Sequence, residues 1–170
     1  MIVRVRPAVP GEFPAVARLT VAAYEADGQE PAATGYDAVL SDVGSRAESG
    51  EVLVAVDGDD RVLGAVTFVR SGSAYAQLCG PGEAEFRMLA VDPGAQRRGV
   101  ATALVRACLA HAAELHCESV IICSRDVAVA AHRLYERMGF VRVPERDFSP
   151  VPGVRLLALS RSVEQLQRHF

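Results

Sequence analysis

The sequence predicts an α/β (α+β) fold with a mixed, mostly antiparallel central sheet and helices on both faces. Two apolar runs, Glu51 to Val56 and Val62 to Val69, flank the turn Asp57-Gly58-Asp59-Asp60, which predicts an antiparallel hairpin. A strand, a helix and a second strand follow one another between Glu83 and Cys123. Such a crossover predicts a parallel strand pair with a right-handed connection. The sheet should therefore be antiparallel in most places and parallel in one.

Length and composition favour a single domain over residues 1–170. Of the 170 residues 50% are hydrophobic, and two domains would each be short of core. The net charge of −3 lacks the basic excess that nucleic-acid binding needs. No apolar run is long enough to span a bilayer, and no charged-then-apolar leader is present. We therefore expect a cytoplasmic protein without nucleic-acid or membrane partners.

The N-terminal part of the chain predicts one strand and two helices. Ile2 to Arg6 alternates apolar and polar residues, which is typical of a strand with one solvated face. Residues from Phe13 to Tyr24 carry a helical pattern, and a weaker helix spans about Tyr36 to Ala47. A loose stretch, Asp27 to Gly35, connects these helices. After the hairpin, Ser71 to Gly82 is a polar, glycine-rich loop that we expect to be mobile.

The strand from Glu83 to Val91 carries a shift in its alternation. Phe86 and Met88 share one face, whereas Leu89 arrives one residue early. One extra residue that reverses the two faces of a strand predicts a β-bulge. The turn Asp92-Pro93-Gly94 then ends the strand, because proline cannot donate to a ladder.

The next helix, about Arg97 to Leu115, begins at a predicted anion site. Its start carries Gln96, Arg97, Arg98 and Gly99. The first amides of a helix have no partner within it, the helix dipole favours negative charge, and glycine lets a phosphate approach the backbone. An ordinary strand-turn-helix corner with solvated arginines is the alternative interpretation.

The C-terminal part predicts a buried strand, a helix and a final strand. Ser119 to Cys123 is continuously apolar, Asp126 is the expected N-cap of the next helix, and Gly139 is its expected C-terminal cap. The remaining segments are a strand start at Val141 to Val143, a loop or hairpin arm at Pro144 to Gly153, a strand at Val154 to Leu159, and a terminal helix or frayed end at Ser162 to Phe170.

Two motifs resemble signatures of the GNAT superfamily of N-acetyltransferases. Gln96-x-x-Gly99-x-Ala101 resembles its Q/R-x-x-G-x-G/A motif, and Leu134-Tyr135-x-x-x-Gly139-Phe140 is similar to its L-Y-x-x-x-G-F motif. The resemblance implies a parallel strand pair splayed at the bulge. It implies acetyl-coenzyme A as co-substrate, without a metal, and direct attack by a primary amine in a ternary complex. The acceptor would be a small-molecule amine or a peptide N-terminus, and a homodimer is left open.

The resemblance also assigns the coenzyme site. The pyrophosphate would lie at the helix start, and the pantetheine arm would pair with the backbone of the bulged strand. The residues so assigned are Leu89, Ala90, Val91, Gln96, Arg97, Arg98, Gly99, Val100, Ala101 and Thr102. Where the family often has an asparagine this chain has Ala128, so one coenzyme contact is absent or replaced, with Ser124 near enough to substitute.

Two residues are candidates for catalysis. Tyr135 matches the family position whose phenol faces the coenzyme sulfur, which would make it the general acid; a core tyrosine is the alternative. Glu85 lies just before the bulge, where relatives carry a carboxylate, and is the expected general base. Glu83 is a lesser candidate, and solvation of a surface explains either carboxylate equally well.

Several alternatives stay open. The loop between the first helices offers acids and phenols that suit a cationic amine or simply solvate the loop: Tyr24, Glu25, Asp27, Glu30, Tyr36 and Asp37. Cys108 and His111 form only one pair at helical spacing, which disfavours a metal site. Cys117 and Cys123 lack an evident activating partner, which disfavours a covalent acyl-cysteine. A coenzyme-binding sensor or scaffold without activity is the alternative function.

Overall fold

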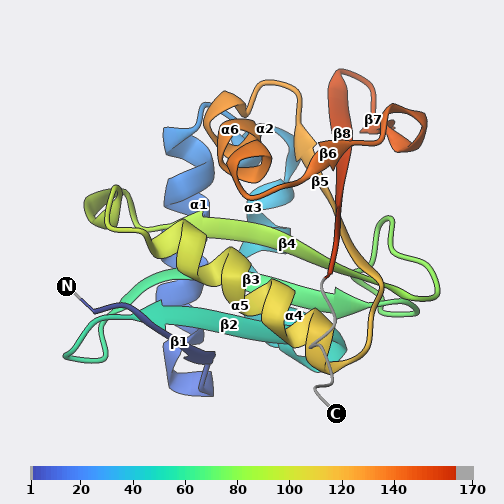
Figure 1. Ribbon diagram of the computed structural model, residues 1–170. Coiled ribbons are helices and arrows are strands. Elements are labelled where there is room, and N and C mark those ends of the chain that lie inside the picture. Colours follow the sequence, from blue (N-terminus) through green and yellow to red (C-terminus); the bar gives the residue numbers. More distant parts are fainter. Residues whose placement is uncertain (1, 164–170) are drawn as a thin grey trace, which may run out of the picture.

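The computed structural model describes residues 2–163, whose strands form one sheet in the order β1-β2-β3-β4-β5-β8-β6, with β7 paired to β8 (Figure 1). The strands are β1 (Arg4–Pro7), β2 (Glu51–Val56), β3 (Val62–Arg70), β4 (Glu83–Val91), β5 (Ser119–Arg125), β6 (Val141–Arg142), β7 (Phe148–Val151) and β8 (Val154–Ser162). Within the described residues, every strand pairing is antiparallel except that of β4 with β5. The predicted fold class is confirmed.

Helices cover both faces of this sheet. They are α1 (Phe13–Ala26), α2 (Pro31–Thr34), α3 (Tyr36–Ser41), α4 (Val43–Ser49), α5 (Val100–Glu114) and α6 (Val129–Arg137). Helix α5 crosses one face, and α1 lies behind the sheet on the other (Figure 1). One buried cluster joins Phe86 to Leu104 and Tyr135, and a second joins Val16 to Val54 and Ala90. The apolar stripes of the sequence thus fill two cores, one on each face.

Three helix starts differ from the sequence prediction, and the first is that of α5, which begins at Val100 and not at about Arg97. The helix expected from Tyr36 to Ala47 is split at Asp42, whose side chain accepts a hydrogen bond from the Ser45 amide and so caps α4. Asp126 is not the N-cap of α6; this helix begins at Val129, with Ala128 at the cap position. The Asp126 amide donates instead to the Arg155 carbonyl, which extends the contact of β5 with β8.

Residues 164–170 of the predicted terminal segment lie outside the described residues.

The C-terminal end of α6 is built as the sequence predicts. Gly139 has a φ of +88°, its amide donates to the Glu136 carbonyl at 3.1 Å, and the Phe140 amide donates to the Tyr135 carbonyl at 3.0 Å. This pair of hydrogen bonds satisfies the last carbonyls of the helix and requires a left-handed residue, which glycine supplies at little cost. Phe140 is consequently folded back against the ring of Tyr135.

Strand β4 contains the predicted bulge and then separates from β5. Met88 has a φ of +57°, and one extra residue of β4 is accommodated between the pairs Thr67–Arg87 and Ala65–Ala90. Strands β4 and β5 pair only from Glu83–Ser119 to Glu85–Ile121, whereas β5 goes on pairing with β8 as far as Arg125. Beyond Glu85 the two parallel strands therefore diverge, and an opening forms between them.

The loop over residues 71–82 is fastened to β4 by two carboxylates. One oxygen of Glu85 accepts hydrogen bonds from the amides of Gln77, Leu78 and Cys79, at 3.0, 2.9 and 3.1 Å. Glu83 accepts from the Gly80 amide and from Arg146. Because these hydrogen bonds hold the backbone from residue 77 to residue 80, this half of the loop is anchored, in contrast to the mobile loop expected from its composition.

Candidate active site

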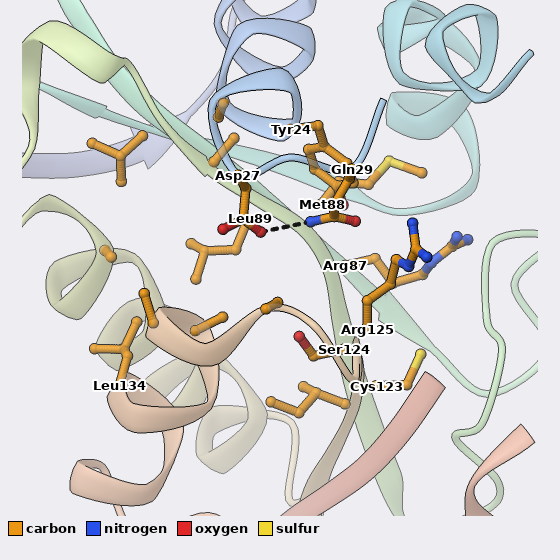
Figure 2. A pocket seen from close by; sticks show the side chains of 18 of the residues that line it. Tyr24, Asp27, Gln29, Arg87, Met88, Leu89, Cys123, Ser124, Arg125 and Leu134 are labelled. Carbon is orange, nitrogen blue, oxygen red and sulfur yellow. Dashed lines mark hydrogen bonds between the residues drawn. The ribbon is translucent and has the colours of Figure 1, made fainter. Parts of the chain in front are cut away.

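A cavity of about 990 Å³ opens where β4 and β5 diverge (Figure 2). Its wall is formed by the end of α1, the α2–α3 segment, β4, the start of α5, β5, α6 and the β7–β8 hairpin. The predicted coenzyme residues that line it are Leu89, Ala90, Val91, Gln96, Arg97, Gly99, Val100, Ala101 and Thr102. Arg98 does not belong to this wall, as far as the described residues define it.

The start of α5 has the properties of an anion site. Gly99 occupies the cap position with a φ of +75° and no capping side chain, and the Ala103 amide is the one that donates to the Gly99 carbonyl. The amides of the first helical turn therefore point out of the helix end without an intrahelical acceptor. A side chain built on Gly99 would meet no atom within 4 Å, so the space beside the backbone is open. These residues fit a pyrophosphate.

Tyr135 lies in the cavity wall with its ring packed in an aromatic cluster. The ring centroids of Phe86 and Phe140 are 5.9 and 5.8 Å from that of Tyr135. Burial raises the pKa of the Tyr135 phenol above its ordinary value, with smaller contributions from nearby groups that include Asp27. The phenol is thus held in its protonated form beside the opening.

Glu85 does not line the cavity. Its side chain is fully buried, one of its oxygens is taken up by the three loop amides, and the other has no hydrogen-bond partner within the described residues. Glu83 pairs with Arg146, and the hydrogen bonds from that guanidinium lower the pKa of Glu83. This geometry makes both carboxylates loop anchors and gives no support to direct contact of Glu85 with an amine in the cavity.

The acceptor side of the cavity contains fewer acids than the sequence suggested. Of the acids and phenols expected at this mouth, Tyr24, Asp27 and Tyr36 line the cavity, whereas Glu25, Glu30 and Asp37 do not. Asp27 accepts a hydrogen bond from the Gln29 side chain at 2.8 Å (Figure 2). Within the described part of the chain, Asp27 is the one carboxylate of the wall.

Arginines of the wall outnumber that single acid. Arg87, Arg97, Arg125 and Arg137 line the cavity within the described residues. Arg87, Arg125 and Arg137 are not among the site residues predicted from the sequence. Arg87 follows Glu85 on the same face of β4 before the bulge, so its alternation could have pointed to it. Arg125 gave no such signal, because its place depends on where β5 leaves β4.

Cys123 lines the same cavity as a neutral thiol. It donates to the side-chain oxygen of Gln77 at 3.1 Å, and burial raises its pKa to about 12. A thiol of such high pKa is a poor nucleophile at neutral pH.

No helix within residues 2–163 has the length and apolar character needed to cross a membrane.

The chain matches one protein family over most of its length. Residues 14–140 fit the model of the acetyltransferase (GNAT) family. The chain belongs to this family. The two motifs that carried the resemblance, at the start of α5 and the end of α6, both lie within the matched residues.

Curated relatives of this GNAT chain include N-acetylaspartate synthetases. The protein from Xenopus tropicalis is 36% identical over 85 residues, and that from Homo sapiens is 33% identical over 85 residues. The matched segment covers 50% of this chain, but 31% and 28% of those two proteins. The chain therefore matches less than a third of the length of these relatives.

Solved GNAT structures share the whole fold. A structure described as histone acetyltransferase HPA2 and related acetyltransferase from Corynebacterium glutamicum has a TM-score of 0.73 at 21% identity, and covers 98% of this chain and 99% of its own. A GNAT acetyltransferase from Staphylococcus aureus has a TM-score of 0.73 at 12% identity, and covers 96% and 100%. At such identities the likeness concerns the fold alone.

One position departs from the usual GNAT pattern. Ala128, at the place of the family asparagine, is buried and lines the cavity. Its methyl group cannot donate or accept a hydrogen bond. Ser124 lines the same cavity from β5 and offers a hydroxyl there, so it stays the predicted substitute.

Proposed function

We propose that this GNAT chain transfers the acetyl group of acetyl-coenzyme A to the primary amine of a small molecule. The observation that carries the proposal is the continuity of one cavity. It extends from the anion site at the start of α5, along the opening between β4 and β5, to the mouth formed by Tyr24 and Tyr36. Donor and acceptor can therefore be bound together, as direct attack in a ternary complex requires.

The backbone of β4 can stabilise the oxyanion of the reaction, and Tyr135 can serve as its general acid. The bulge at Met88 interrupts the ladder of β4 beside Leu89, Ala90 and Val91. In the proposed mechanism an amide of this segment donates to the oxygen that becomes negative as the amine attacks the thioester carbonyl. Tyr135, kept protonated by burial, donates its proton to the leaving thiolate. The neutral thiol of Cys123 is consistent with a mechanism without an acyl-cysteine.

We assign the general base to Asp27 in place of Glu85. Asp27 is the one carboxylate that lines the cavity among the described residues, and it lies at the end of α1. Its charge contributes to the raised pKa of Tyr135, so the two groups act on each other across the cavity. A carboxylate in this place can take the proton of an ammonium acceptor directly or through one water.

The first acceptor to test is L-aspartate. The relatives from Xenopus tropicalis and Homo sapiens are named N-acetylaspartate synthetases. These relatives match half of this chain and less than a third of their own length, so their names make aspartate a candidate acceptor and do not assign it.

The proposal is tested with a panel of amines and acetyl-coenzyme A. Release of coenzyme A, together with the mass of the acetylated product, is expected for at least one small amine. A sensor or scaffold would bind acetyl-coenzyme A in calorimetry and release none with any amine, and that result would overturn the proposed function.

A further inference from the structure

We infer that the acceptor amine carries a carboxylate, which Arg87 and Arg125 bind on the acceptor side of the cavity. The inference rests on the proposed function and deepens it, because it names the chemical class of the acceptor. Both residues line the cavity, Arg87 from β4 and Arg125 from the end of β5. Figure 2 shows both side chains extending toward the same side of the cavity.

Arg87 is held in place by two polar contacts. One of its terminal nitrogens donates to the Tyr36 hydroxyl and the other to the Tyr75 carbonyl, both at 3.0 Å. A guanidinium has five N–H donors, so these two bonds fix its orientation and leave further donors for a ligand. The contacts also tie its position to α3, which borders the acceptor mouth.

Arg125 has a donor that the protein leaves without a partner. Its Nε atom is buried and has no hydrogen-bond partner within the described residues. A buried polar donor without a partner costs free energy until a ligand or water satisfies it. A carboxylate matches the planar fork of arginine with two parallel hydrogen bonds, whereas a neutral amide offers one acceptor and no charge.

The charges of the cavity fit an acceptor that carries both an ammonium group and a carboxylate. Arg97 lies beside Gly99 at the start of α5 and Arg137 lies at the end of α6, so the two arginines left for the acceptor are Arg87 of β4 and Arg125 of β5. Asp27 can receive the ammonium group while the two arginines receive the carboxylate. A polyamine or another purely cationic acceptor would face two arginines with one acid, and like charges at short range repel. An amino acid satisfies both signs.

The test compares acceptors that carry a carboxylate with the corresponding amides. We would measure kcat/KM for L-aspartate, its two monoamides and its diamide, and for the pairs glycine and glycinamide, and β-alanine and β-alaninamide. The carboxylate member of a pair is expected to be the better acceptor by about 10- to 100-fold, the effect of one charge-assisted hydrogen-bonded pair. Putrescine serves as the purely cationic amine and is expected to be poor.

Substitutions then connect this preference to the arginines. Arg125→Gln is expected to remove most of the preference by lowering kcat/KM for the carboxylates much more than that for the amides. Arg125→Lys keeps the charge without the fork and should restore part of the difference. Arg18→Gln is the matched control, because Arg18 is exposed on α1 away from the cavity wall.

The outcomes separate this inference from the proposed function. Transfer to amides or putrescine at least as fast as to the carboxylates would overturn the inference and leave the proposed function standing. If no amine is acetylated, the proposed function fails, and calorimetry of L-aspartate and its diamide with the protein–coenzyme A complex decides the inference alone. Tighter binding of L-aspartate that Arg125→Gln abolishes would support it, and equal binding of the two would overturn it.

Discussion

Tyr135 and Cys123 line the same cavity, and burial keeps both of them protonated. Burial raises the pKa of Tyr135 above its ordinary value of about 10, so this phenol remains a proton donor throughout the neutral range. The pKa of Cys123 is raised to about 12, which keeps its sulfur uncharged. At the scale of single residues, the environment thus suits one group to proton donation and makes the other unreactive.

Tyr135→Phe is expected to lower kcat by about 10²- to 10⁴-fold, the usual effect of losing a general acid. The substitution keeps the ring and its contacts with Phe86 and Phe140, so affinity for acetyl-coenzyme A and the melting temperature should change little. Steady-state kinetics, calorimetry and thermal melting check the three quantities. Full turnover with an earlier melt would make the phenol a structural group.

Asp27→Asn and Glu85→Gln distinguish the two candidate bases. We expect Asp27→Asn to lower kcat/KM by about 10²- to 10⁴-fold and to remove the acidic limb of its pH profile, because an amide cannot take a proton. Glu85→Gln keeps an oxygen for the three loop amides and should retain turnover. The pH dependence of kcat/KM for both variants is the measurement. Loss of the acidic limb in Glu85→Gln alone would return the role to Glu85.

At the scale of elements, we expect coenzyme binding to depend on the start of α5. Gly99→Asp puts a negative side chain into the open space beside the first-turn amides. We expect a loss of acetyl-coenzyme A affinity of about 1.5–3 kcal/mol or more, since each charge-assisted hydrogen bond contributes about that much. Gly72→Asp is the matched control, because Gly72 also has a positive φ and open space but does not line the cavity. Equal calorimetric affinities of the two variants would sink the assignment.

A second element-scale feature is the carboxylate that joins β6 to β8. Asp147 accepts two hydrogen bonds from Arg142 of β6, at 2.8 and 2.7 Å, and one from the Ala158 amide of β8 at 2.7 Å. The hydrogen bonds from Arg142 lower the pKa of Asp147 to about 2, whereas it is about 3.9 in an unfolded chain. This carboxylate therefore stabilises the fold above about pH 4, and the contribution is lost as the pH falls toward 2.

Asp147→Asn should consequently lower the free energy of unfolding by about 1–2 kcal/mol at pH 7. At pH 3, where much of the wild-type contribution has gone, the difference between the two proteins should be clearly smaller. Urea unfolding at the two pH values measures it. A difference that is the same at pH 7 and pH 3 would mean that the charge of Asp147 is not what stabilises this edge.

Elements whose signal is local could be predicted from the sequence, and those set by distant contacts could not. The alternation of residues in β4 predicts the bulge at Met88, and the glycine at the end of α6 predicts the cap at Gly139. Asp126 looked like a cap by the same local reasoning, but β5 pairs with β8 as far as Arg125, and the Asp126 amide adds a hydrogen bond to the Arg155 carbonyl. At this position the contact between the two strands outweighs the local preference of aspartate for a helix start.

The same distinction applies to the site. The proposed coenzyme side consists of the start of one helix and the backbone of one strand, so a short motif is enough to predict it. Glu85 stood at the right position of β4, yet a loop that closes over it determines its contacts. Arg125 enters the cavity because β5 leaves β4 after Ile121, and this separation depends on the whole sheet.

At the scale of the whole molecule, the coenzyme should hold together parts that the sheet leaves apart. Its proposed site is bordered by β4, α5, β5 and α6, which belong to both sides of the opening. A ligand at 100 times its dissociation constant adds about 2.7 kcal/mol of stability. For a chain of this size that corresponds to a rise in melting temperature of roughly 5–10 °C.

Thermal melting with and without acetyl-coenzyme A measures this rise. Gly99→Asp should show at most about half of this rise, and Gly72→Asp should show the full increase. A shift in Gly99→Asp equal to that of the wild type would place the ligand elsewhere on the molecule.

The two halves of the cavity are made of different chemical material. The proposed coenzyme half offers main-chain amides at the start of α5 and beside the bulge of β4, whereas the proposed acceptor half offers the side chains of Asp27, Arg87 and Arg125. Codon changes replace side chains and leave the peptide amide as it was. Over generations a duplicated gene could therefore exchange its acceptor through a few replacements on β4, β5 and the end of α1, while it inherited its acetyl donor unaltered.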